Sequence, residues 1–190
     1  MLELAPLLAS ALILGLLGGG HCLGMCGGLM GALTLAIPPE QRGKRLQLLI
    51  AYNAGRIFSY TCAGLIIGLA GFAVANSPGA MILRVIAACL LIAMGLYLAG
   101  IWSGLTRIEA LGRGLWRYIQ PLTKRFMPVT SLPRAVILGA LWGWLPCGLV
   151  YSTLLWAASQ GNALDSAALM LAFGLGTIPV LLATGLAAER

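Results

Sequence analysis

The chain has 190 residues, of which 60% are hydrophobic and only 9% are charged, and its mean hydropathy is +0.96. A soluble domain carries about 25% charged residues, so this composition excludes a water-soluble globular protein. Apolar stretches longer than the roughly 18 to 20 residues that cross a bilayer as a helix recur along the chain. The sequence therefore predicts an all-α polytopic membrane protein. The formal charge of +7 requires no nucleic acid, because basic loops and anionic lipid account for it.

Five apolar spans are predicted in chain order. They cover residues 5–37, 48–74, 80–102, 135–158 and 163–188. The first stops at a Pro-Pro pair, and the second stops at an Asn-Ser-Pro-Gly turn. A cleaved signal peptide is rejected, because the residues before the first apolar stretch carry an acid and no Lys or Arg.

Basic residues lie in alternate connections, which predicts the orientation. The first and third connections hold Arg42, Lys44, Arg45, Arg107, Arg113, Arg117, Lys124, Arg125 and Arg134. The second and fourth hold no Lys or Arg, so the basic connections are expected in the cytoplasm and the N-terminus outside. Within residues 103–134, apolar residues recur at three- and four-residue spacing. This favours an amphipathic helix on the membrane surface, with a solvated loop as the alternative.

Two short motifs recur at an offset of about 121 residues. Residues 25–29 (MCGGL) resemble residues 146–149 (PCGL), and residues 53–57 (NAGRI) resemble residues 174–178 (GLGTI). Spans one and four enter the membrane from opposite sides, so the two halves are expected to be inverted repeats.

This repeat divides the chain into three parts: a first three-helix repeat at 1–102, the basic connection at 103–134, and a second, incomplete repeat at 135–190. Inverted repeats place functional sites near the bilayer midplane, on helices broken by Gly or Pro. We therefore expect a broken helix at each cysteine motif. The hinge residues of these breaks would be Gly27, Gly28, Pro146 and Gly148.

The first cysteine motif, HCLGMC at residues 21–26, gathers the softest metal ligands in the chain. On a regular helix Cys22 and Cys26 would share a face, with His21 and Met25 as the neighbouring pair. Such a donor set favours Cu(I), and Zn(II) also suits it. The alternative is a stretch of small residues that lets helices pack closely. That alternative explains the glycines but not the histidine, since an ionisable residue inside a span is a functional candidate by default.

The cysteines also indicate a redox role. The C-x-x-x-C spacing puts Cys22 and Cys26 near the limit of disulfide reach, whereas a disulfide between Cys26 and Cys147 is geometrically freer. The other two, Cys62 and Cys89, lie singly in apolar spans, and we expect them to be small buried apolar residues.

Span two carries several polar side chains for a membrane helix. They are Asn53, Arg56, Ser59 and Thr61. Arg56 either snorkels to the cytoplasmic headgroups or lines a cavity with Asn53, as a cation that stabilises a thiolate or attracts an anion. Tyr52 and Trp102, near span ends, are expected in the interfacial aromatic belt.

Together these residues resemble the DsbD/CcdA transmembrane superfamily, through HCLGMCGG in the first span, NAGRI in the second and PCGLVY in the fourth. The nearest branch is the UreH-like one, often labelled sulfite exporter TauE/SafE-like. The resemblance implies six helices in two inverted three-helix repeats, although only five spans are visible here. In redox members, one cysteine in span one and one in span four form a reversible disulfide, and Cys26 and Cys147 occupy those positions. His21, Cys22 and Met25 are additions that the redox motif does not need.

The leading hypothesis is a thiol–disulfide electron conduit of a bacterial cytoplasmic membrane, oxidoreductase-like, serving thiol or metalloprotein maturation such as cytochrome biogenesis. Cys26 and Cys147 would exchange disulfides with Cys22 as a third thiol, without a cofactor. The resemblance implies a thioredoxin-like cytoplasmic donor and an extracytoplasmic thiol or metalloprotein acceptor. The alternative is a Cu(I) or other soft-metal transport protein with His21, Cys22, Met25 and Cys26 as ligands. A lesser alternative is a sulfite-type anion exporter, which only Arg56 supports.

Overall fold

The fold of the protein is that of a computed structural model. The described residues are 4–20, 31, 34, 37, 43–75, 81–82, 85–86, 88–89, 92–93, 96, 129–144 and 147–187. The amphipathic helix predicted within the basic connection lies outside them, and only residues 129–134 of that connection are described.

Within these residues the chain forms helices and connecting turns. The helices are α1 (Leu4–Leu17), α3 (Arg45–Ala75), α6 (Leu132–Trp142), α7 (Gly148–Ala158) and α8 (Ala163–Ala187). Two of them, α3 and α8, are long and apolar enough to cross a membrane, and the other three are shorter apolar helices. The predicted all-α membrane fold is confirmed.

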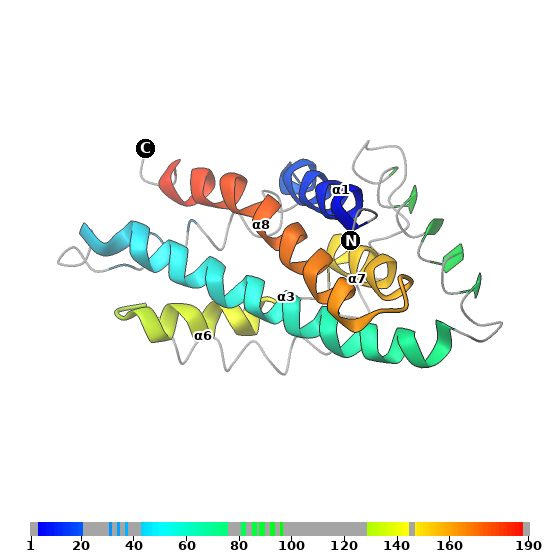
Figure 1. The fold of residues 1–190 in the computed structure, drawn as a ribbon. Coiled ribbons are helices and arrows are strands. Elements are labelled where there is room, and N and C mark those ends of the chain that lie inside the picture. Colours follow the sequence, from blue (N-terminus) through cyan, green and yellow to red (C-terminus); the bar gives the residue numbers. More distant parts are fainter. Residues whose placement is uncertain are drawn as a thin grey trace.

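Helices α3 and α8 form the centre of the bundle and run antiparallel (Figure 1). The guanidinium of Arg45, at the start of α3, donates a hydrogen bond to the carbonyl oxygen of Leu186, near the end of α8, at 3.1 Å. Helix α1 packs against α8, whereas α6 packs against α3. Helix α7 touches both central helices. The crossings of α1 on α8 and of α6 on α3 thus flank the central pair.

Glycines bring these helix pairs into backbone contact. A Cβ atom at Gly139 of α6 would collide with the carbonyl oxygen of Tyr52 on α3, and one at Gly55 of α3 would collide with the carbonyl oxygen of Val136. Small residues let membrane helices approach this closely, and van der Waals packing then supplies much of the association energy. The α3–α6 crossing therefore depends on glycine on both helices.

The α1–α8 crossing repeats the same contacts. A Cβ at Gly15 of α1 would collide with the carbonyl oxygen of Phe173, and one at Gly176 of α8 would collide with that of Leu12. Phe173 and Gly176 follow Tyr52 and Gly55 by 121 residues. Leu12 and Gly15 precede Val136 and Gly139 by 124 residues. The contact positions on α3 and α8 are therefore separated by the same 121 residues as the sequence motifs.

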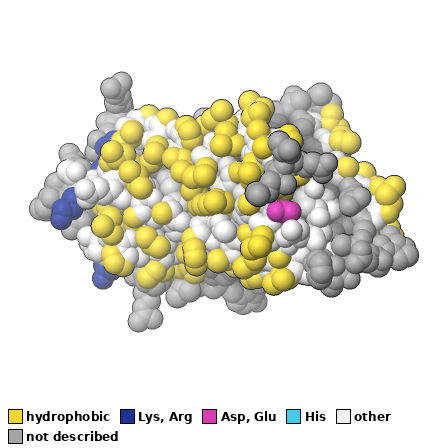
Figure 2. Space-filling model, viewed as in Figure 1, with side chains coloured by type: hydrophobic (Ala, Val, Ile, Leu, Met, Phe, Trp, Pro, Cys, Tyr) yellow, Lys and Arg dark blue, Asp and Glu magenta, His cyan; other side chains and the backbone are white. Residues whose placement is uncertain are grey.

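Large apolar side chains are exposed along both central helices, including Phe58 (66% exposed) and Leu164 (74%). Figure 2 shows hydrophobic side chains across the visible face, with the Lys and Arg side chains that are visible on it gathered at one end. Apolar side chains around the middle and cations at one end are the surface of a protein that spans a bilayer.

Tyr52 corrects one prediction, since its side chain is fully buried rather than placed in an interfacial belt. It lies in the second turn of α3, where α6 crosses closely enough to touch its backbone. Position along a span could not reveal that a second helix covers this turn.

A broken helix and a buried arginine

The fourth predicted span is interrupted at the second cysteine motif. Helix α6 ends at Trp142 and α7 begins at Gly148, which confirms the break expected at this motif. Cys147 is the N-cap residue of α7, with extended backbone angles (φ −114°, ψ 142°), and its carbonyl accepts the amide hydrogen of Tyr151 at 3.2 Å. The predicted hinge Gly148 is thus the first residue of α7, while Pro146 lies outside the described residues.

Helix α3 holds the end of α6 at this break. A Cβ at Gly143, which follows α6, would lie 2.6 Å from the Cβ of Ser59 and 3.2 Å from the carbonyl oxygen of Arg56. The hydroxyl of Ser59 donates a hydrogen bond to the carbonyl oxygen of Ala140 at 2.8 Å. The residues that lead into the break are therefore fixed against the middle of α3.

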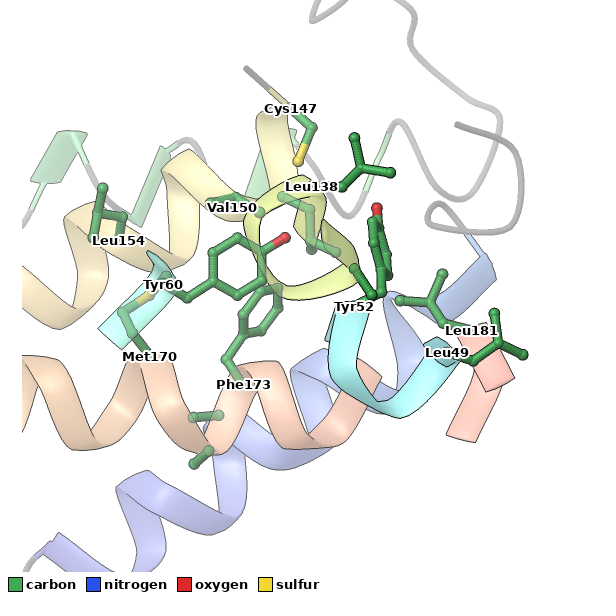
Figure 3. Close-up of a cluster of buried hydrophobic side chains, with 14 of the residues drawn as sticks. Leu49, Tyr52, Tyr60, Leu138, Cys147, Val150, Leu154, Met170, Phe173 and Leu181 are labelled. Carbon is green, nitrogen blue, oxygen red and sulfur yellow. The ribbon is translucent and has the colours of Figure 1, made fainter. Parts of the chain in front are cut away.

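Cys147 lies at the edge of the protein core. Its side chain is 9% exposed and belongs to the buried cluster that includes Tyr60, Leu138 and Val150 (Figure 3). An N-cap position at the start of a half-helix faces amide groups and the positive end of the helix dipole, which stabilise negative charge.

Arg56 is buried between α3 and α8, at 2% exposure. Its Nε donates to the hydroxyl of Tyr60 at 3.1 Å, and its Nη2 donates to Oγ1 of Thr177 on α8 at 3.0 Å. The guanidinium carbon also lies 5.2 Å from the centre of the Tyr60 ring, a cation–π distance. The snorkelling interpretation is therefore wrong: this cation ties the two central helices together inside the bundle.

Asn53 lines an apolar groove of about 480 Å³ between α3 and α8, alongside Ala54, Ile57 and Leu175. Its amide nitrogen donates to the carbonyl oxygen of Leu49 within α3 at 2.9 Å. Arg56 is not among the residues that line this groove. Of the two residues predicted to line a cavity, Asn53 lines this groove, whereas Arg56 lies in the core.

The other predicted site residues belong to the first cysteine motif. His21, Cys22, Met25, Cys26, Gly27 and Gly28 lie outside the described residues. In the described part of the chain no group of three or more His, Cys, Asp or Glu could hold a metal ion. Cys62 is half-buried, and Cys89 is exposed, which corrects the expectation that it is buried.

Sequence reasoning did not select Thr177 or Tyr60 as site residues. Thr177 lies 121 residues after Arg56, so the two hydrogen-bonded residues occupy matching positions of the recurring motif. The motif offset was the signal that could have paired them. Tyr60 carries no such signal beyond standing one helical turn after Arg56.

A family model described as "Cytochrome C biogenesis protein transmembrane region" matches residues 10–190. No curated protein and no solved structure matches the chain. The match agrees with the broader resemblance carried by the cysteine motifs, and the UreH-like branch remains a prediction. It extends over almost the entire chain, so this protein belongs to the cytochrome c biogenesis transmembrane family.

Proposed function

We propose that the chain is a transmembrane thiol–disulfide conduit that passes reducing equivalents from a cytoplasmic dithiol to extracytoplasmic thiol or metalloprotein maturation partners. The observation that carries this proposal is the position of Cys147, at the N-cap of a half-helix inside the bundle. Family membership supports the same chemistry at a coarser level. The membrane would be a bacterial cytoplasmic one, with the end that holds Lys44, Arg45 and Arg134 in the cytoplasm.

The exchange needs two thiols, and Cys26 is the partner that we propose for Cys147. A thiolate of the cytoplasmic donor attacks the Cys26–Cys147 disulfide, which gives a mixed disulfide and releases one cysteine. The second donor thiol then displaces the other cysteine, so the donor leaves as a disulfide and the pair holds two electrons and two protons as thiols. The pair reduces an extracytoplasmic disulfide by the reverse sequence.

We also propose that the two halves are inverted repeats whose relative movement exposes the cysteine pair to each side in turn. The paired crossings support this arrangement, because Gly139 on Tyr52 and Gly15 on Phe173 are equivalent contacts in opposite halves. The Arg56–Thr177 bond joins matching positions of the halves. A contact between two equivalent positions lies on the axis that relates the two repeats. A movement that exchanges the arrangements of the repeats leaves such a contact in place, so the outward-open and inward-open states would both retain it.

Thiol trapping tests the proposed conduit. In membranes quenched with acid and alkylated, we expect a Cys26–Cys147 disulfide that reduced thioredoxin removes and that is absent in Cys26→Ser and Cys147→Ser. The Cys62→Ser variant is the matched control and should trap like the parent chain. A pair that stays reduced under every growth condition would contradict the conduit.

The soft ligands of residues 21–26 support a second candidate, a Cu(I) transport or delivery protein. Protein purified under reducing conditions should then carry about one Cu(I) per chain, and Cys22→Ser should lose it while Cys62→Ser retains it. No bound copper after loading with Cu(I) would remove this candidate. The sulfite-type exporter gains no support, because Arg56 is buried against Tyr60 and Thr177.

A further inference from the structure

The last turn of α6 leaves backbone carbonyls that need partners, as every helix end does. The carbonyl oxygens of Gly139 and Leu141 accept the amide hydrogens of Gly143 and Trp144 at 2.9 and 3.3 Å. The carbonyl oxygen of Ala140 instead accepts the hydroxyl of Ser59, from a different helix. Ser59 therefore satisfies a carbonyl at the end of α6.

The equivalent position in the other half of the chain is Val180, whose side chain has no hydroxyl. There Gly19 faces Val180, as Gly143 faces Ser59. Val180 follows Ser59 by the same 121 residues that separate the other central-helix partners. The steric contact is therefore retained in both halves, whereas among the described residues the side-chain hydrogen bond from this position is made by Ser59, beside the break that carries Cys147.

We propose that Ser59 is a positioning residue for Cys147: its bond to Ala140 fixes the end of α6 and thereby sets how accessible and reactive the Cys147 thiol is. Ser59 is 5% exposed and sits on the face of α3 that touches Gly143. Leu138 of α6 and Cys147 belong to the same buried cluster, so a shift of the end of α6 reaches Cys147 through packed side chains. This inference rests on the proposed function only in assigning Cys147 to redox exchange.

The test compares Ser59→Thr with Ser59→Val in a full-length chain whose other four cysteines are replaced by alanine. Threonine and valine have nearly the same shape, so any steric effect beside Gly143 is common to both, and only threonine keeps the hydroxyl. We expect Ser59→Val to raise the alkylation rate of Cys147 by maleimide about threefold to tenfold, because a buried carbonyl has lost its partner. Ser59→Thr should remain within about twofold of the parent.

Ser166→Ala is the matched control. The hydroxyl of Ser166 donates to the carbonyl oxygen of Ala157 at 2.7 Å, so this substitution removes a similar buried bond at the opposite end of α7. It should leave the Cys147 rate unchanged. A second chain keeps only Cys62, a half-buried residue on α3. There Ser59→Val should leave the alkylation rate of Cys62 unchanged, because the effect is local to the end of α6. A general loosening of the protein would instead raise the rates of Cys62 and Cys147 alike.

Equal Cys147 rates in Ser59→Thr and Ser59→Val would overturn the proposal, as would an equal rise in Ser166→Ala. With all cysteines present, Ser59→Val should also change the equilibrium constant of the Cys26–Cys147 disulfide against dithiothreitol, whereas Ser59→Thr should leave it near the parent value. If that disulfide never forms, the proposed conduit fails, while the single-thiol comparison still decides the role of Ser59.

Discussion

Replacing Gly139 by alanine is expected to lower the melting temperature of the purified protein by about 10 °C. The added Cβ would collide with the carbonyl oxygen of Tyr52 and lie 3.1 Å from its Cα, so α6 must move away from α3. A clash with side chains typically costs about 1 to 3 kcal/mol, and a clash with the backbone of a packed helix lies at or above the top of that range. About 3 kcal/mol corresponds to roughly 10 °C in a chain of this size.

Two further substitutions make this a test of the crossing rather than of glycine in general. Gly15→Ala should cause a similar loss, because its Cβ would meet the carbonyl oxygen of Phe173 in the equivalent contact of the other half. Gly43→Ala should melt like the parent, since no described atom lies within 4 Å of a Cβ there. Thermal melting followed by size-exclusion chromatography in detergent measures all three. An unchanged melting temperature for Gly139→Ala would contradict the close crossing.

Thr177→Val is expected to destabilise the protein by about 2 kcal/mol, or roughly 6 °C in melting temperature. The substitution keeps the shape of the side chain but removes the oxygen that accepts from Nη2 of Arg56 and donates to Gly174. Hydrogen bonds to charged groups contribute about 1.5 to 3 kcal/mol. A buried cation also depends on such partners for its solvation.

Thr184→Val is the control for Thr177→Val. Its hydroxyl donates to the carbonyl oxygen of Val180 in its own helix at 2.7 Å, and no described bond joins it to another helix. Loss of this local bond should shift the melting temperature by no more than about 2 °C. Equal shifts in the two variants would mean that the Arg56–Thr177 bond adds nothing beyond a threonine's local hydrogen bond.

Several features of the fold could be predicted from the sequence because they depend on local or compositional physics. Apolar length specified α3 and α8 as membrane-spanning helices, since a helix satisfies the backbone hydrogen bonds of such a segment within the segment itself. The break beside Cys147 also followed from local chemistry, because Pro146 lacks the amide hydrogen that a continuous helix would need there.

Other features required knowledge of which helices touch. Tyr52 was expected at the interface and is buried, because α6 covers its turn of α3. Cys89 was expected to be buried and is exposed. In lipid, inward- and outward-facing positions of a helix are both apolar, so hydropathy alone does not separate them.

By itself, the sequence determined that the chain is a helical membrane protein, where its long helices run, and that its cysteine motifs recur in two halves. The tertiary structure alone decided that α1 packs on α8 and α6 on α3, and that Arg56 points inward to Tyr60 and Thr177. It also decided that Ser59 completes the end of α6. Hydropathy reports the cost of placing a residue in the bilayer, whereas these contacts depend on which small residues let two backbones meet.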